Sequence, residues 1–273
     1  MLFCLFTGTM SQEAWIAARG RTPLAKRTMH PAFHTWDIQD ESLESVENRI
    51  HDGVPRGNLR TRAGAYLDTF VRLFPWSLPK PGGTVLEIGS GLGYIMEAAL
   101  QRLNPSRIVG LDVAANMIDK ARRRLARDRV EDARIEFCHY DGVTIPYPDN
   151  SFDFVYSVAT IQHIPKAYAY NLFFEISRIL KPKAFAALHT PSYALLPAHE
   201  KLAPLKEECM RQIRNETGHW HFFYSQQELL NVLSVGVGVG WLSIQEQDRT
   251  LWTTFSKDTE VAFCNETTLS QPG

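Results

Sequence analysis

The sequence lacks an excess of charge of either sign. Its 273 residues include 29 lysines and arginines and 30 aspartates and glutamates, which leaves a formal net charge of −1. A protein so balanced exerts no overall attraction on nucleic acid or on an anionic membrane surface. We therefore expect neither a nucleic acid nor a membrane among its partners.

Closely spaced cysteines and long apolar runs are also missing. The four cysteines stand far apart, and none belongs to the C-x-x-C pair typical of zinc and redox sites. No apolar run has the length of a membrane-spanning helix, and the apolar start, 1–6, lacks the basic residues of a signal peptide. We expect a soluble, cytoplasmic protein without a metal centre.

The chain does have a regular alternation of two patterns. Short apolar segments predict strands, and apolar residues at every third or fourth position predict amphipathic helices. Strands that alternate with helices form a parallel sheet covered on both faces, which binds ligands at the carboxyl ends of its strands. Segments 241–246 and 251–256 predict a final antiparallel hairpin, and the glycines within 236–240 predict a turn before it. The other expected elements are helices over 42–50 and 61–74, strand 84–88, helix 94–103, strand 107–112, helix 115–127, strands 135–139 and 152–157, helix 167–180, strand 184–189 and helix 226–233.

The alternating glycines Gly89, Gly91 and Gly93 directly follow the strand over 84–88. Glycine readily adopts positive φ values and lets a ligand approach the backbone, and the helix that follows directs free N–H groups toward that ligand. The dinucleotide-binding spacing is G-x-G-x-x-G. Here the third glycine comes one residue early, and an acid, Glu87, stands two residues before the first. The arrangement predicts a nucleotide-like ligand, with a plain strand-to-helix turn as the alternative.

Acidic residues follow two further strands. Asp112 ends the strand over 107–112, about twenty residues after the glycines, where a carboxylate can accept hydrogen bonds from both hydroxyls of a ribose. Capping of the next helix is its alternative role. Asp141 closes the next strand and can accept a hydrogen bond from an adenine amino group, although the Asp141-Gly142 pair is also a common turn.

Taken together, the motifs of 85–189 resemble those of class I S-adenosylmethionine-dependent methyltransferases, in the small-molecule, type 11-like branch. One departure is Lys183-Ala184, where the family usually has two glycines, and it affects a turn. The matching pieces, in order, are Val-Leu-Glu-Ile-Gly-Ser-Gly-Leu-Gly (85–93), Val-Gly-Leu-Asp (109–112), Tyr-Asp-Gly (140–142), Asn-Ser-Phe-Asp (150–153), Gln-His-Ile (162–164) and Arg-Ile-Leu-Lys-Pro (178–182).

The resemblance implies a Rossmann-like α/β fold with a seven-stranded, mostly parallel sheet, helices on both faces and an antiparallel C-terminal hairpin. It also implies S-adenosyl-L-methionine (SAM) as the cofactor and in-line methyl transfer to a small-molecule acceptor. The residues implied to bind the cofactor are Glu87, Gly89, Ser90, Gly91, Gly93, Asp112, Val113, Met117, Asp141, Gly142 and Ser157.

Two signatures of other methyltransferases are absent after the fourth strand. Val158, Ala159 and Thr160 stand where metal-dependent catechol enzymes place acids, and the Asn/Asp-Pro-Pro-Tyr signature of enzymes that methylate amino groups of nucleic acids is missing. We therefore expect a reaction that requires no metal.

His163, just past the fourth strand, is the best-placed candidate base for an acceptor hydroxyl or protonated amine, with a structural hydrogen bond as its alternative role. Two other function classes stay open. One is a non-catalytic SAM-binding or regulatory protein. The other is a nucleotide-dependent oxidoreductase, which the glycine spacing and Glu87 disfavour.

A long insertion over 191–224 is predicted to be a lid, because long insertions in compact domains tend to be functional. With the helix over 61–74, it is expected to roof the acceptor site, and the alternative is an apolar plug that packs against the domain. The residues expected to contact the acceptor are His219, His221 and Tyr224.

The expected organisation has three parts. An N-terminal tail and cap helix occupy 1–54, the methyltransferase domain with its insertion occupies 55–259, and a C-terminal tail occupies 260–273.

Overall fold

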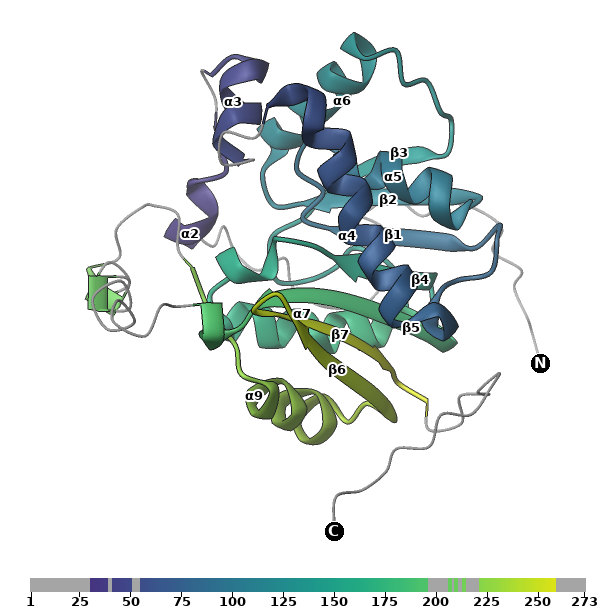
Figure 1. The fold of residues 1–273 in the computed structure, drawn as a ribbon, viewed down its shortest axis with the longest axis vertical. Coiled ribbons are helices and arrows are strands. Elements are labelled where there is room, and N and C mark those ends of the chain that lie inside the picture. The colour runs from purple at the N-terminus through teal and green to yellow at the C-terminus, as the bar shows by residue number, and fades with distance from the viewer. Residues whose placement is uncertain are drawn as a thin grey trace, which may run out of the picture.

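The molecule is built on one seven-stranded sheet of order β3-β2-β1-β4-β5-β7-β6 (Figure 1). Strands β1 to β5 are parallel, and β7 is antiparallel to both of its neighbours. The strands are β1 (Thr84–Ile88), β2 (Arg107–Asp112), β3 (Ile135–His139), β4 (Phe152–Ser157), β5 (Leu180–Pro191), β6 (Trp241–Gln247) and β7 (Thr250–Ser256). The computed structural model describes residues 30–38, 41–50, 55–195, 206–207, 209–210, 213–214 and 221–258.

Helices cover both faces of the sheet (Figure 1). The helices are α2 (Pro31–His34), α3 (Leu43–Ile50), α4 (Leu59–Leu73), α5 (Tyr94–Leu103), α6 (Ala115–Arg127), α7 (Lys166–Ile179) and α9 (Gln226–Leu230). Short 3-10 turns are η1 (Arg56–Asn58), η2 (Pro75–Ser77), η3 (Ile161–His163) and η4 (Tyr193–Leu195), and η5 (Asn231–Val237) is a π-helix.

Two apolar cores result from the alternation of side chains along the strands. Phe154 of β4 packs on one face with α4 and α5, through residues such as Leu67 and Met96. Val155, the next residue, packs on the other face with α7 and α9, through residues such as Phe173 and Leu229. Successive strand residues point to opposite faces, so apolar strands of this kind need a helix layer on each side. The expected fold class is confirmed.

The fifth strand starts earlier than the sequence predicts. Leu180 already pairs with Phe152, and the register then shifts so that Phe154 faces Phe185. Lys183 lies inside this irregularity with a φ of 63°, the left-handed region that glycine adopts most easily. The predicted turn is therefore an irregularity within one longer strand.

The helix predicted over 226–233 is also longer than the sequence predicts. It continues as the π-helix η5 and ends at Gly238, whose φ is 72°. The first glycine of the 236–240 run is thus helical, and the turn is shorter than predicted.

We call α2, α3, η1 and the first turns of α4 the cap. Val46 of α3 is fully buried in an apolar cluster that includes Leu92 of the glycine loop. The carboxylate of Glu47, 2% exposed, accepts hydrogen bonds from the Tyr94 hydroxyl at 2.5 Å and from the Arg127 guanidinium at 2.6 and 3.1 Å. The cap is thereby fastened to both α5 and α6.

Residues 1–29, the predicted C-terminal tail and most of the insertion over 191–224 lie outside the described residues, so the domain boundaries remain predictions. Among the described helices, none combines the length and the apolar character needed to cross a bilayer. In the same part of the chain, no three His, Cys, Asp or Glu side chains gather in a way that suits a metal ion.

Candidate functional site

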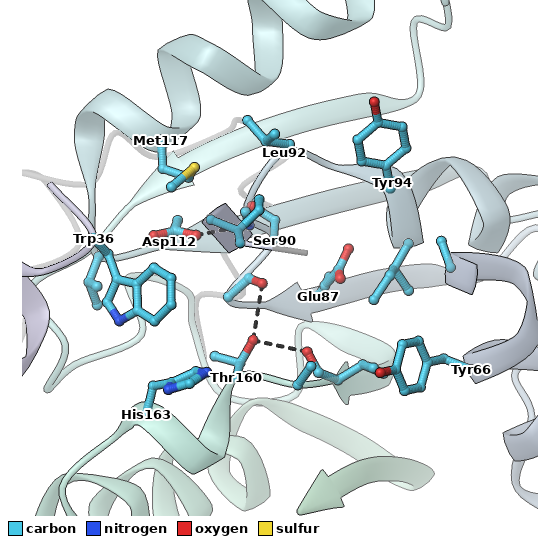
Figure 2. A pocket seen from close by; sticks show the side chains of 18 of the residues that line it. Trp36, Tyr66, Glu87, Ser90, Leu92, Tyr94, Asp112, Met117, Thr160 and His163 are labelled. Carbon is cyan, nitrogen blue, oxygen red and sulfur yellow. Dashed lines mark hydrogen bonds between the residues drawn. The ribbon is translucent and has the colours of Figure 1, made fainter. Parts of the chain in front are cut away.

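An open cavity lies at the carboxyl ends of β1, β2 and β4, and the cap and α4 supply its other wall. Its empty space, which includes solvent outside its mouth, is about 1110 Å³. In the view of Figure 2, Asp112 and Trp36 lie at the left and Tyr66 at the right, with Glu87 between them. The sequence-predicted residues that line the cavity are Glu87, Gly89, Ser90, Gly91, Asp112, Val113, Met117 and His163.

The three glycines form a turn, and Gly89 and Gly91 of this turn line the cavity. Gly89, Gly91 and Gly93 have φ values of 72°, 50° and 78°, all in the region that strains other residues. A Cβ on Gly89 would lie 2.1 Å from the Thr160 side chain, whereas a Cβ on Gly91 would meet nothing within 4 Å. The loop is tied to β2 by the Gly89 N–H, which donates to the Leu111 carbonyl at 2.7 Å. Gly91 therefore leaves open space for a ligand beside the backbone.

Asp112, 7% exposed, ends β2 at the cavity and shapes the loops around it. One carboxylate oxygen accepts the Gly91 N–H at 3.0 Å, and the other accepts the Ala114 N–H at 3.0 Å just before α6. Burial raises the pKa of Asp112, and hydrogen bonds from the Ala114 and Gly91 N–H groups oppose this. Nearby, the buried Ser90 hydroxyl has no hydrogen-bond partner among the described residues.

Glu87 presents a second buried acid to the cavity. Its side chain is 1% exposed and accepts a hydrogen bond from the Tyr156 hydroxyl at 3.1 Å. Burial raises the pKa of Glu87 well above its ordinary value, which the hydrogen bond from Tyr156 only partly offsets. A buried acid of this kind favours a cationic ligand, because a nearby positive charge stabilises its ionised form.

His163 lines the cavity from η3, directly after β4. Its ring centroid lies 4.8 Å from that of Trp36 and 4.7 Å from that of His221. The chain segment that carries His221 is fixed here because the Phe222 N–H donates to the Gln162 carbonyl at 2.7 Å. The structure therefore brings together His163 and His221, which the sequence predicted on the acceptor side, and adds Trp36.

Tyr224 is a correction to the predicted lid. It is fully buried in the apolar core, its N–H donates to the Pro191 carbonyl at 2.9 Å, and it does not line the cavity. For Tyr224 the alternative of an apolar plug describes the structure, because the segment folds back onto the end of β5. His219 lies outside the described residues.

Four residues of the predicted cofactor set do not line the cavity: Gly93, Asp141, Gly142 and Ser157. The Ser157 hydroxyl is buried and donates to the Ile88 carbonyl at 3.1 Å, which joins β4 to β1. One Asp141 oxygen accepts the N–H groups two and three residues further on, at 2.8 and 2.7 Å. These contacts match the turn that was the alternative for Asp141.

The sequence predicted a roof from the helix over 61–74, but it did not name the residues of this helix or of the cap that line the cavity. Arg62 and Tyr66 are four residues apart on α4 and thus share one face of the helix, and both line the cavity. Trp36 comes from the loop after α2, and Ala159 from the loop after β4. The spacing of Arg62 and Tyr66 indicated that they share one helix face, but it does not show that this face lines a cavity.

Comparisons with known proteins agree with this geometry. Residues 85–183 match the family described as a methyltransferase domain. The chain is 36% identical over 103 residues to phosphoethanolamine N-methyltransferase 2 of Caenorhabditis elegans, and this match covers 38% of this chain and 22% of that protein. It is 28% identical over 155 residues to 27-O-demethylrifamycin SV methyltransferase of Amycolatopsis mediterranei, and this match covers 56% of this chain and 48% of that protein. The matches thus span less than half the length of either relative.

A solved structure has the same fold. The putative S-adenosyl-L-methionine-dependent methyltransferase from Methanococcus maripaludis superposes with a TM-score of 0.56 at 22% identity, over 82% of this chain and 99% of that one.

Proposed function

Residues 85–183 form a class I SAM-dependent methyltransferase domain, and from this premise we propose that the protein transfers the methyl group of SAM to a small-molecule acceptor. The observation that carries the proposal is the convergence of Gly91, Asp112 and Glu87 on one cavity at the carboxyl ends of the strands. In parallel α/β sheets this edge is where ligands bind.

The residues around the cavity fit the chemistry of SAM. Gly91 leaves room for a ligand against the backbone, Asp112 offers carboxylate oxygens to ribose hydroxyls, and the Ser90 hydroxyl has hydrogen-bonding capacity to spare. Glu87 supplies a buried acid that favours a positive charge. When bound, SAM supplies a methyl group already activated by its sulfonium.

The chain contributes position. The cavity holds the cofactor and the acceptor side by side, and well-oriented reactants gain up to about 7–11 kcal/mol in model reactions. For an acceptor that carries a hydroxyl or protonated amine, His163 is the base, because its side chain lines the cavity. Its ring lies beside that of the exposed residue His221. The proton taken from the acceptor then resides on the His163 imidazole.

The acceptor is small and partly apolar under this proposal. The cap and α4 contribute Trp36, Ile50, Leu59 and Tyr66 to the cavity wall, with Arg62 as their basic residue. The names of the relatives, a phosphoethanolamine and a rifamycin methyltransferase, support small-molecule acceptors as a class.

Separate calorimetric titrations with S-adenosylhomocysteine and with NAD test the identity of the cofactor. We expect the protein to bind S-adenosylhomocysteine and not NAD. Asp112→Ala should weaken that binding strongly, and Asp119→Ala, a control at an exposed position of α6, should leave it unchanged. Binding of NAD instead would refute the proposal.

Incubation with isotopically methyl-labelled SAM and a metabolite extract tests the activity. A labelled small molecule, formed by wild-type protein and lost in Asp112→Ala, supports transfer. Tight cofactor binding with no labelled product across extracts would favour the non-catalytic alternative.

A further inference from the structure

His189 is a buried histidine that lies just behind the cavity wall. It belongs to β5, is 6% exposed and does not itself line the cavity. Its ring centroid lies 5.3 Å from that of Tyr66 and 4.7 Å from that of Trp252. Its Nδ1 atom accepts a hydrogen bond from the Ala159 N–H at 3.4 Å. His189 thus contacts two residues of the cavity wall, Tyr66 from α4 and Ala159 from the loop after β4.

The loop after β4 has a backbone conformation that needs support. Ala159 has a φ of 53°, in the left-handed region that is unfavourable for residues with a Cβ and persists only where the surroundings enforce it. Thr160 supports the loop from one side, because its hydroxyl lies within hydrogen-bond distance of the carbonyls of Gly89 and Val158, at 3.2 and 3.1 Å. The imidazole of His189 supports it from the other side.

The hydrogen bond to Ala159 requires a neutral imidazole with its proton on Nε2. Burial lowers the pKa of His189 to about 4, so the ring is neutral at physiological pH. A neutral ring also packs against the Tyr66 and Trp252 rings without the desolvation cost of a buried charge.

We propose that His189 is a positioning residue of the methyl-transfer site: it holds Ala159 in its left-handed conformation and Tyr66 against the cavity, and so fixes two parts of the cavity wall at once. The proposal rests on the proposed function only in taking SAM as the ligand. A side chain that merely filled space at this position would leave the Ala159 N–H without a partner and its conformation unsupported.

The test compares His189→Asn with His189→Leu, because the asparagine Oδ1 replaces the Nδ1 acceptor and leucine fills the space without one. Phe255→Leu is the control, since Phe255 is fully buried on β7 and does not line the cavity. Calorimetry measures the affinity for S-adenosylhomocysteine, hydrogen exchange measures protection of the Ala159 amide, and thermal melting measures stability. If the leucine variant does not fold, His189→Gln replaces it, because glutamine places its acceptor nearer the Nε2 position.

We expect the leucine variant to bind about tenfold more weakly, equivalent to about 1.4 kcal/mol, and to lose protection at Ala159. The asparagine variant retains both, and Phe255→Leu melts at a lower temperature with its affinity unchanged. Adding Ala159→Gly to the leucine variant restores affinity in part, because glycine adopts the left-handed conformation without support.

Equal affinity and equal Ala159 protection in the leucine and asparagine variants would overturn the proposal. So would an affinity loss that follows melting temperature across all variants, the Phe255→Leu control included. If wild-type protein bound no S-adenosylhomocysteine, the proposed function would fail, and exchange at Ala159 would still decide the role of His189.

Discussion

Asp128 connects the cap to the domain, and its removal provides the sharpest test of that connection. Its carboxylate, 6% exposed, accepts hydrogen bonds from Arg56 at 2.9 Å, from Arg60 at 3.0 Å and from Arg127 at 2.8 Å. Arg56 and Arg60 belong to the cap, and Asp128 directly follows α6. Asp128→Asn keeps the shape of the side chain and removes the charge that holds these groups together.

The pKa of Asp128 gives the magnitude of the expected effect. Burial raises it, but the hydrogen bonds and charges of the surrounding arginines outweigh this and lower it from 3.8 to about 2. A carboxylate whose pKa is lowered in the folded state stabilises the fold fully at pH values above its pKa in the unfolded chain. It loses that contribution as the pH falls through its pKa in the folded state. By linkage this amounts to about 2 kcal/mol above pH 5 and about 1 kcal/mol at pH 3.

Urea denaturation at pH 7 and pH 3 measures this contribution. We expect Asp128→Asn to lower the free energy of unfolding by about 2 kcal/mol at pH 7, and its melting temperature by roughly 5 °C. The difference from wild type should shrink by about half at pH 3. Asp119→Asn is the matched control: its pair with Arg122 is 3.2 Å long and both side chains are exposed, so its effect should stay below about 1 kcal/mol.

A loss at pH 7 no larger than that of Asp119→Asn would refute the reasoning, and so would a loss that does not change between pH 7 and pH 3. Titration with S-adenosylhomocysteine adds a functional readout. A cap loosened by Asp128→Asn should bind the ligand more weakly, because Leu59 and Arg62, on the same helix as Arg60, line the cavity.

Three further predictions concern the cavity. Gly91→Val should abolish binding of S-adenosylhomocysteine in calorimetry, because its side chain enters the space that Gly91 leaves open; unchanged affinity would make the loop a plain turn. Asp112→Asn should lower both that affinity and the melting temperature, because an amide cannot accept both N–H groups that the carboxylate accepts; a variant indistinguishable from wild type would contradict the assigned role. The pKa of Glu87 is raised well above its ordinary value of 4.5, so the unfolded chain releases this proton first and stability declines as the pH rises from that ordinary value toward the folded one. Glu87→Gln should therefore flatten the decline of melting temperature as the pH rises above 4.5, and curves of equal slope would count against it.

The predicted site residues that lie away from the cavity share one feature. Ser157 and Asp141 have polar groups that the chain itself uses, in a strand-to-strand hydrogen bond and in a turn. Tyr224 is aromatic in sequence and lies in the core in space. Residue type tells which groups can bind a ligand, but not whether the fold has already engaged them.

The sequence by itself determined the order of strands and helices and the position of the glycine loop. The bounds of β1, β2, β3, β4, α5 and α6 agree with the segments predicted for them, because side-chain periodicity and glycine spacing act over a few neighbouring residues. For the same reason Gly91 and Asp112 could be placed at the cavity: both follow directly from the ends of predictable strands.

The sequence predicted a roof from the helix over 61–74, but only the tertiary structure decided which residues close the cavity and what they contact. The Trp36 ring packs against His163, and the Tyr66 ring packs against His189. The Glu47 carboxylate accepts a hydrogen bond from Arg127. Each pair joins residues far apart along the chain. No local pattern encodes such contacts, because they depend on how the cap docks onto the finished sheet. The floor of the site is thus encoded locally in strands and their loops, whereas its roof results from long-range packing and charge pairing.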